Sequence, residues 1–173
     1  MFQNSSVGYG VVIKGDLRMV RIGTHSTVGD NTSIHESPFP LGPDHDGSTM
    51  IGHYVVIGSS CSLRGCTVEN YCVIGSSCVL SPGSYMESNT VLEPRSVLQP
   101  DQRIPSGQVW SGNPAKFSRN LTPKELEEME AKALDATRYA PLHAEQNYLS
   151  TSIYREIQHS QQKPKKKFVL WQD

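Results

Sequence analysis

The chain carries aliphatic side chains at intervals of six residues. The longest run is Val68, Ile74, Leu80, Met86, Leu92, Leu98 and Ile104, and shorter runs precede it at Ile22, Val28 and Ile34 and at Ile51, Ile57 and Leu63. A period of six fits neither the 3.6-residue period of a helix nor, by itself, the two-residue alternation of an ordinary strand. It indicates a structural repeat, which decides the fold before any other feature.

The residues around each aliphatic position are also patterned. A small side chain stands two residues earlier, at Ser26, Thr32, Val55, Cys61, Cys66, Cys72, Cys78, Ser84, Thr90 and Ser96. Glycine often follows the aliphatic residue, and Asn or Asp comes next, as in Gly29-Asp30-Asn31. Each repeat therefore predicts one large and one small inward side chain, followed by a corner that tolerates positive φ. Three such sides make a coil of about 18 residues, and coils stack as parallel strands about 4.8 Å apart.

We therefore expect an all-β solenoid, a parallel β-helix, over residues 1–117. The step from Leu63 to Val68 is five residues instead of six, and a Pro- and Gly-rich stretch separates Ile34 from Ile51. This stretch predicts a loop insertion at about residues 36–50.

A helical segment is expected over residues 118–160. Thr122-Pro123-Lys124-Glu125 has the residues of a helix start, with Thr as N-cap, Pro at the first helical position and Glu at the third. Pro141 interrupts the pattern, and a second helical stretch is predicted from about 142 to 157. Residues 161–173 are basic and then apolar; the lysines read as a solvated segment, and the apolar end suggests docking on a partner.

Composition excludes several function classes. The formal net charge of −1 argues against nucleic acid as a main partner. No run of 18 apolar residues is present, so we expect no transmembrane segment. The first residues show neither a signal-peptide core nor the arginines of a transit peptide.

The four cysteines are spaced by five, six and six residues, which is the spacing of the repeat and not of a zinc site. We expect all four to pack in the core as small hydrophobes. Cys61 and Cys78 should stack one coil apart, where a disulfide is geometrically conceivable.

Several motifs follow one another in a specific order. They are VIKGD at 12–16, RIG at 21–23, GDN at 29–31 leading to Ile34-His35, LRGCTVE at 63–69 and RIPSGQVWSGNPAKF at 103–117. In this order they resemble the γ-class carbonic anhydrase family, and most closely its members that are subunits of mitochondrial respiratory complex I. The resemblance covers roughly residues 7–148, and it implies a left-handed β-helix that forms trimers. Gly-Asn-Pro-Ala alone is less specific, because it also occurs in hexapeptide acyltransferases.

The resemblance also implies where zinc would bind. In the family, each zinc lies at a subunit interface and is held by two histidines of one subunit and one of the next. The three ligand positions fall here on His35, Ser59 and Arg64, so two of the three histidines are missing. Serine is a poor zinc ligand, and the arginine side chain has no acceptor lone pair and stays charged. Catalytic zinc needs three protein ligands and an open water position, so we expect no catalytic residue and no metal cofactor at the sites to which this chain contributes.

The six-residue spacing also predicts how these three positions lie. Ile34 and Leu63 should share one face, one coil apart, which places His35 beside Arg64. Ser59 lies on the preceding face and would point toward a different subunit. In a mixed trimer at most one zinc site, between the other two subunits, could then stay intact.

Two further positions are judged by the same comparison. The Arg-Gly-Asp of the family becomes Lys14-Gly15-Asp16, and we interpret Lys14 and Asp16 as trimer-interface residues, with a solvated surface pair as the alternative. His53, in Ile51-Gly52-His53, imitates a ligand motif but comes six residues too early, so we expect no ligand role for it.

The resulting hypothesis is a catalytically inactive structural subunit. It would form a heterotrimer with related γ-carbonic-anhydrase-like subunits and bind membrane-arm subunits of complex I, peripherally on the matrix side of the mitochondrial inner membrane. The alternatives are an active zinc-dependent γ-carbonic anhydrase with an altered site, a hexapeptide acyltransferase with a catalytic histidine, and a structural β-helix of another assembly such as the dynactin pointed end.

Overall fold

Three parallel sheets form the body of the protein. The structure is a computed structural model that describes residues 4–42, 45–138 and 141. Within these residues, sheet A contains β1 (Ser6–Val7), β4 (Thr27–Val28), β7 (Val56–Ile57), β10 (Val73–Ile74), β13 (Val91–Leu92), β16 (Gln108–Ser111) and β17 (Lys116–Asn120). Sheet B contains β2 (Val12–Lys14), β5 (Ser33–His35), β8 (Ser62–Arg64), β11 (Val79–Leu80) and β14 (Val97–Leu98). Sheet C contains β3 (Val20–Ile22), β6 (Thr49–Ile51), β9 (Thr67–Val68), β12 (Tyr85–Met86) and β15 (Arg103–Ile104).

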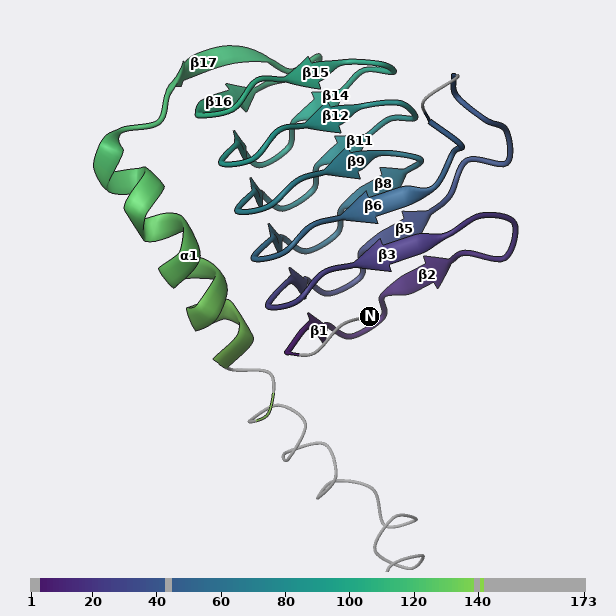
Figure 1. The fold of residues 1–173 in the computed structure, drawn as a ribbon, viewed down its shortest axis with the longest axis horizontal. Coiled ribbons are helices and arrows are strands. Elements are labelled where there is room, and N and C mark those ends of the chain that lie inside the picture. Colours follow the sequence, from purple (N-terminus) through teal and green to yellow (C-terminus); the bar gives the residue numbers. More distant parts are fainter. Residues whose placement is uncertain (1–3, 43–44, 139–140, 142–173) are drawn as a thin grey trace, which may run out of the picture. The chain divides into compact units, whose positions relative to one another are not determined.

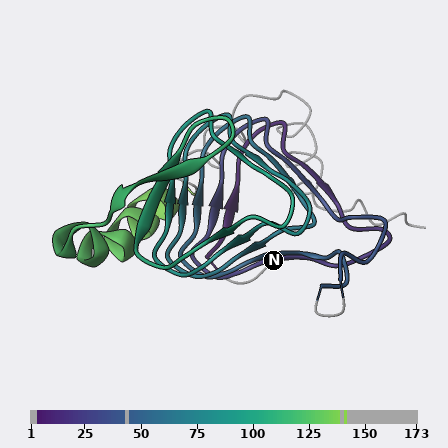
Figure 2. The same cartoon turned by 90° about the horizontal axis from the view of Figure 1, so that it is seen from above.

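The chain visits the sheets in the repeating order A, B, C, so each coil contributes one strand to each sheet (Figure 1). Seen from above, the coils enclose a three-sided prism (Figure 2). Aliphatic residues of successive coils stand in register; Leu80, for example, pairs with Leu63 below and Leu98 above. The expected left-handed parallel β-helix is confirmed.

The inward side chains form one continuous core. Every six-residue aliphatic position from Ile22 to Ile104 is at most 3% exposed. The small positions are buried with them, because the prism is too narrow at the corners for larger side chains. The pattern of one large and one small inward residue per side is therefore confirmed.

The corners depend on two backbone features. The third residue after the aliphatic one usually has a positive φ, as at Asn31 (56°) and Ser60 (59°). At the first residue after it, glycine allows close stacking: a Cβ on Gly58 would lie 2.6 Å from the backbone nitrogen of Ser76 in the next coil. A side chain at that position would push the coils apart.

The five-residue step and the insertion meet at one corner. Gly65 turns the chain with φ +51°, and a Cβ there would lie 2.8 Å from the Cβ of Ser37 in the insertion. The insertion ends at Ser48 and is thus shorter than the predicted 36–50. Thr49 and Met50 belong instead to β6, because they pair in register with β3.

The chain leaves the prism through β16 and β17, which pair antiparallel, so that extended structure continues to Asn120. The helix α1 (Pro123–Arg138) follows. Its start is the expected capping box: the Thr122 N–H donates to Glu125 Oε2 (2.9 Å), and the Glu125 N–H donates to Thr122 Oγ1 (3.3 Å). Figures 1 and 2 show α1 along the outer face of sheet A, and Met129 and Ala133 are buried.

The helical stretch expected at 142–157 and the tail at 161–173 lie outside the described residues. None of the helical residues that the structure describes forms a segment long and apolar enough to cross a bilayer.

Candidate functional site

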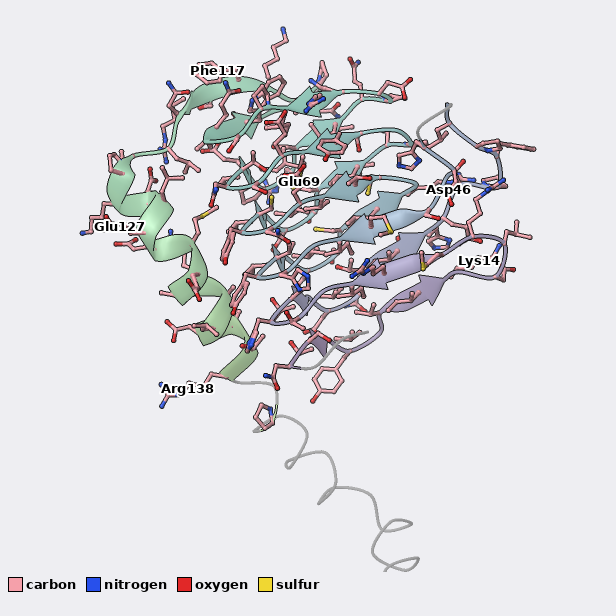
Figure 3. All side chains as sticks on the ribbon, in the orientation of Figure 1. Lys14, Asp46, Glu69, Phe117, Glu127 and Arg138 are labelled. Atoms are coloured by element: carbon pink, nitrogen blue, oxygen red, sulfur yellow. The ribbon has the colours of Figure 1, made fainter. Side chains whose placement is uncertain are left out.

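Two of the three predicted ligand positions, His35 and Arg64, lie on the outer surface of sheet B. The residue after each inward aliphatic side chain points outward, and in β2, β5 and β8 these residues are Lys14, His35 and Arg64. They stand in register, Lys14 opposite His35 and His35 opposite Arg64. His35 is half-buried and Arg64 is exposed. The prediction that His35 and Arg64 are neighbours one coil apart is confirmed; Figure 3 labels Lys14 at the β2 end of this column.

Ser59 lies elsewhere, as the spacing predicts. It follows β7 of sheet A, just before the positive-φ residue Ser60, at the corner where the chain passes to sheet B. Its carbonyl accepts a hydrogen bond from the Ser77 N–H of the next coil (2.8 Å). Within this chain the structure therefore brings together His35 and Arg64 but not Ser59.

These residues do not fit a zinc ion. His35 supplies one imidazole, Arg64 supplies a fixed positive charge instead of a lone pair, and Ser59 supplies a weakly coordinating hydroxyl on another face. Among residues 4–42 and 45–138, no three His, Cys, Asp or Glu side chains are grouped so that they could hold a metal ion.

The cysteines form no site. All four are free and buried. Burial raises the pKa of Cys66 to about 12 and that of Cys72 to about 11. A hydrogen bond with the Cys78 thiol, together with burial, also raises the pKa of Cys61. The expectation that the cysteines pack in the core is confirmed, and Cys61 and Cys78 are not joined by a disulfide.

Lys14 and Asp16 form an exposed ion pair within the chain, with Nζ 3.6 Å from Oδ1. The pKa of Asp16 is lowered, chiefly by a hydrogen bond with Glu36 and also by the charge of Lys14. The pair thus exists without a partner subunit, and its role in a trimer interface stays a prediction.

Glu36 is a buried acid that sequence reasoning missed. It follows His35 directly and is 4% exposed. Its Oε1 accepts a hydrogen bond from the Leu17 N–H (3.4 Å), and its buried Oε2 has no hydrogen-bond partner among the described residues. Its own backbone N–H donates to the Lys14 carbonyl (3.3 Å), so an acid predicted to lie in a loop is held against the preceding coil. No signal in the sequence identifies it.

His53 serves the corner of sheet C. Its ring Nδ1 accepts a hydrogen bond from the Thr24 N–H of the preceding coil (3.0 Å), and its backbone N–H donates to Asn70 Oδ1 of the next coil (2.8 Å). The Nδ1 lone pair of the ring is therefore used in a hydrogen bond between neighbouring coils.

A second cluster missed from the sequence covers the outside of sheet C near Glu69, which is labelled in Figure 3. The Tyr85 hydroxyl donates to Glu69 Oε1, and the Ser88 hydroxyl donates to Oε2 (2.6 Å). These bonds lower the pKa of Glu69, that from Ser88 most. Arg103 stacks over the Tyr85 ring at 5.1 Å and donates to Glu87 Oε1 (2.7 Å). Both carboxylates of the cluster thus have hydrogen-bond partners within it, and the cluster joins three coils.

Comparison with known proteins identifies relatives of one family, although no family model matches the chain. It is 37% identical over 146 residues to gamma carbonic anhydrase 1, mitochondrial, of Arabidopsis thaliana, covering 84% of this chain and 52% of the relative. It is 36% identical over 161 residues to gamma carbonic anhydrase-like 2, mitochondrial, of the same plant, covering 91% of this chain and 61% of the relative. The chain thus spans little more than half the length of these relatives.

Shorter relatives match over most of their length. A probable carbonic anhydrase of Methanocaldococcus jannaschii is 30% identical over 139 residues, which is 80% of each protein. A solved structure from Anaplasma phagocytophilum, described as a hexapeptide transferase family protein, superposes with a TM-score of 0.72 at 31% identity over 80% of this chain and 77% of that one. The hexapeptide prism with its ordered motifs, and relatives matched along most of their own length, establish that this chain belongs to the gamma carbonic anhydrase family.

Proposed function

We propose that this chain is a catalytically inactive, structural member of its family that assembles with related subunits. The observation that carries the proposal is the register of β5 and β8, which sets Arg64 opposite His35. A family ligand position then carries a fixed positive charge on the strand next to the one that carries the remaining imidazole, about 4.8 Å away.

The charge makes zinc binding unfavourable. Repulsion between a divalent cation and a guanidinium about 5 Å apart is roughly 2 kcal/mol at the dielectric of water and about 7 kcal/mol at the effective value near a protein surface. Salt screening reduces these figures at an exposed site. The loss of two imidazole ligands weakens zinc binding further, so the repulsion and the missing ligands both disfavour the metal.

Family membership supports a proposal for the assembly and for its place in the cell. Related subunits would form a mixed trimer with this chain, and Lys14 and Asp16 would lie in its interface. The mitochondrial names of the Arabidopsis relatives support a mitochondrial location. The resemblance to complex I subunits supports docking on membrane-arm subunits, at the matrix side of the inner membrane. The stiff prism and α1 would then serve to hold partners.

Zinc analysis of the purified chain tests the inactive reading. We expect far less than one zinc per chain in the wild type, and we expect zinc to rise toward one per chain in the Ser59→His/Arg64→His double variant, which restores three histidines. The Ser59→His single variant is the matched control, because it adds a ligand and keeps the arginine. Stoichiometric zinc and CO₂ hydration by the wild type would establish the active carbonic anhydrase instead. Binding of acetyl-CoA, measured by calorimetry, would favour the hexapeptide acyltransferase.

The location is tested separately, by the mass of the native assembly that contains the chain. Migration with a megadalton respiratory particle supports the complex I assignment. A free homotrimer contradicts it.

A further inference from the structure

The three outer faces of the prism differ in what covers them. Sheet A lies under α1, which follows it in both views (Figures 1 and 2). Sheet C carries the cluster of Glu69, Tyr85 and Ser88 and the ion pair of Glu87 with Arg103, in which the charged groups satisfy one another. Sheet B has neither a covering element nor a closed polar network among the described residues.

Sheet B exposes two parallel columns. One is mixed and contains, in register, Val12, Ser33, Ser62, Val79 and Val97, of which Val12 is 56% and Val79 38% exposed. The other is basic and contains Lys14, His35 and Arg64, one per coil. Exposed valines toward the two ends of one column and a row of basic groups beside it are features found at protein interfaces.

Only the first member of the basic column is paired. Lys14 Nζ lies 3.6 Å from Asp16 Oδ1. Arg64 and His35 make no ion pair with a carboxylate in the part of the chain that the structure describes. The neighbouring acid Glu36 is buried against the segment between β2 and β3, where its Oε1 accepts a hydrogen bond from the Leu17 N–H. The column therefore has an excess of positive charge at Arg64.

We propose that Arg64, with His35 beside it, binds a carboxylate side chain of a neighbouring subunit, so that an interprotein ion pair takes the place of a metal centre on this face. The guanidinium offers a planar fork of donors that matches a carboxylate, and His35 adds a further donor about one strand spacing away. This inference rests on the proposed function, because it names the chemistry that joins the chain to its partner subunits.

The first experiment measures association of the full chain with a co-expressed mitochondrial gamma carbonic anhydrase relative, by native mass spectrometry and by dissociation kinetics. Arg64→Glu should weaken association roughly thirty-fold or more, since it sets two carboxylates against each other in a desolvated contact. Arg64→Lys keeps the charge but loses the fork, so its affinity should lie between those of Arg64→Glu and the wild type. Arg21→Glu is the matched control, because it reverses an exposed strand arginine on sheet C and should change affinity less than three-fold.

The second experiment identifies the partner group. Carbodiimide joins an amine to a carboxylate without a spacer, so the Arg64→Lys complex should yield a cross-link between position 64 and one acidic residue of the partner. The wild type, which has no amine at position 64, is the control and should not yield that product.

The outcomes separate the two proposals. If the wild type associates with no relative, the proposed function and this inference both fail. If it associates and Arg64→Glu behaves like Arg21→Glu, the shared assembly stands and the role of Arg64 is refuted. If acetate, used as the probe, binds the isolated chain through Arg64 while association is unchanged in Arg64→Glu, the site takes a small anion and the docking inference is wrong.

Discussion

Gly58→Ala tests the idea that glycine after the aliphatic position sets the distance between coils. A Cβ on Gly58 would lie 2.6 Å from the Ser76 nitrogen and 2.8 Å from the Gly75 carbonyl carbon, which are both backbone atoms of the next coil. Ordinary contact needs about 3.4 Å or more, so the two coils would have to separate locally by nearly 1 Å. No side chain can rotate away to relieve the contact.

The expected cost is the sum of two effects. Overpacking of a tightly packed site costs about 1–3 kcal/mol. Separation also lengthens the hydrogen bond that the Gly58 N–H donates to the Ile74 carbonyl, now 2.8 Å, and weakening it costs up to about 1 kcal/mol. For a chain of this size, a loss of about 1–4 kcal/mol lowers the melting temperature by roughly 3–15 °C.

Thermal unfolding followed by circular dichroism measures this loss. Gly42→Ala is the matched control, because a Cβ there meets nothing within 4 Å and the residue lies in the insertion, outside the coil stack. We expect its melting temperature to stay within about 2 °C of the wild type. A Gly58→Ala protein that melts with the wild type would refute the argument that coil spacing depends on this glycine.

Three further predictions rest on burial and charge. Leu80→Ala should destabilise the protein by about 2–5 kcal/mol in urea denaturation, whereas Val79→Ala on the same strand should cost about 1 kcal/mol or less, because Leu80 is 1% exposed and Val79 is 38% exposed. The Arg119 guanidinium and the Thr122 cap lower the pKa of Glu125 to about 2; because the folded pKa lies below the unfolded value near 4.3, this contribution is present at neutral pH and is lost as the pH falls from about 4 toward 2. Acid titration of helical circular dichroism should show the loss in the wild type and a smaller one in Glu125→Gln. The Cys61 thiol lowers the pKa of Cys78 to about 7, but all four cysteines are at most 2% exposed. Iodoacetamide should therefore leave all four unmodified in the native state and label all four in denaturant, and rapid native labelling would contradict their burial.

The six-residue ladder predicted the prism because it describes contacts between side chains that are equivalent in successive coils. Leu63 and Leu80 are 17 residues apart in the sequence, yet the repeat alone predicts that they touch. The same reasoning placed Arg64 opposite His35 across the long insertion, since the spacing counts whole coils whatever is inserted at a corner.

What the sequence did not reveal depends on particular side chains at corners. Tyr54 and Tyr71 adopt the positive φ that the pattern associates with Gly, Asn and Asp, and their stacked rings, 5.1 Å apart, favour this conformation. The burial of Glu36 involves contacts with Lys14 and Leu17 at a corner where the residues follow no repeat from which to predict it. Contacts of this kind depend on the shapes of particular side chains and not on the six-residue repeat, so no pattern in a single sequence predicts them.

The position of the ligand residues explains how a family site can disappear while the fold persists. His35 and Arg64 point outward from the strand, and the aliphatic residues before them, Ile34 and Leu63, are fully buried. Replacing a histidine by arginine at an outward position removes no core contact, so folding does not oppose it, whereas a change one residue earlier would open a cavity. Along a parallel strand, outward-facing and inward-facing residues alternate. Each coil therefore places a residue that can bind a ligand directly next to a residue that packs in the core.

We therefore expect that exchanging residues 59 and 64 between this chain and a zinc-binding relative would transfer metal binding and leave the melting temperatures of both proteins within about 3 °C of their parents. A large loss of stability in either exchanged protein would show that the outward positions also support the fold, and the argument that chemistry and packing are separable here would be wrong.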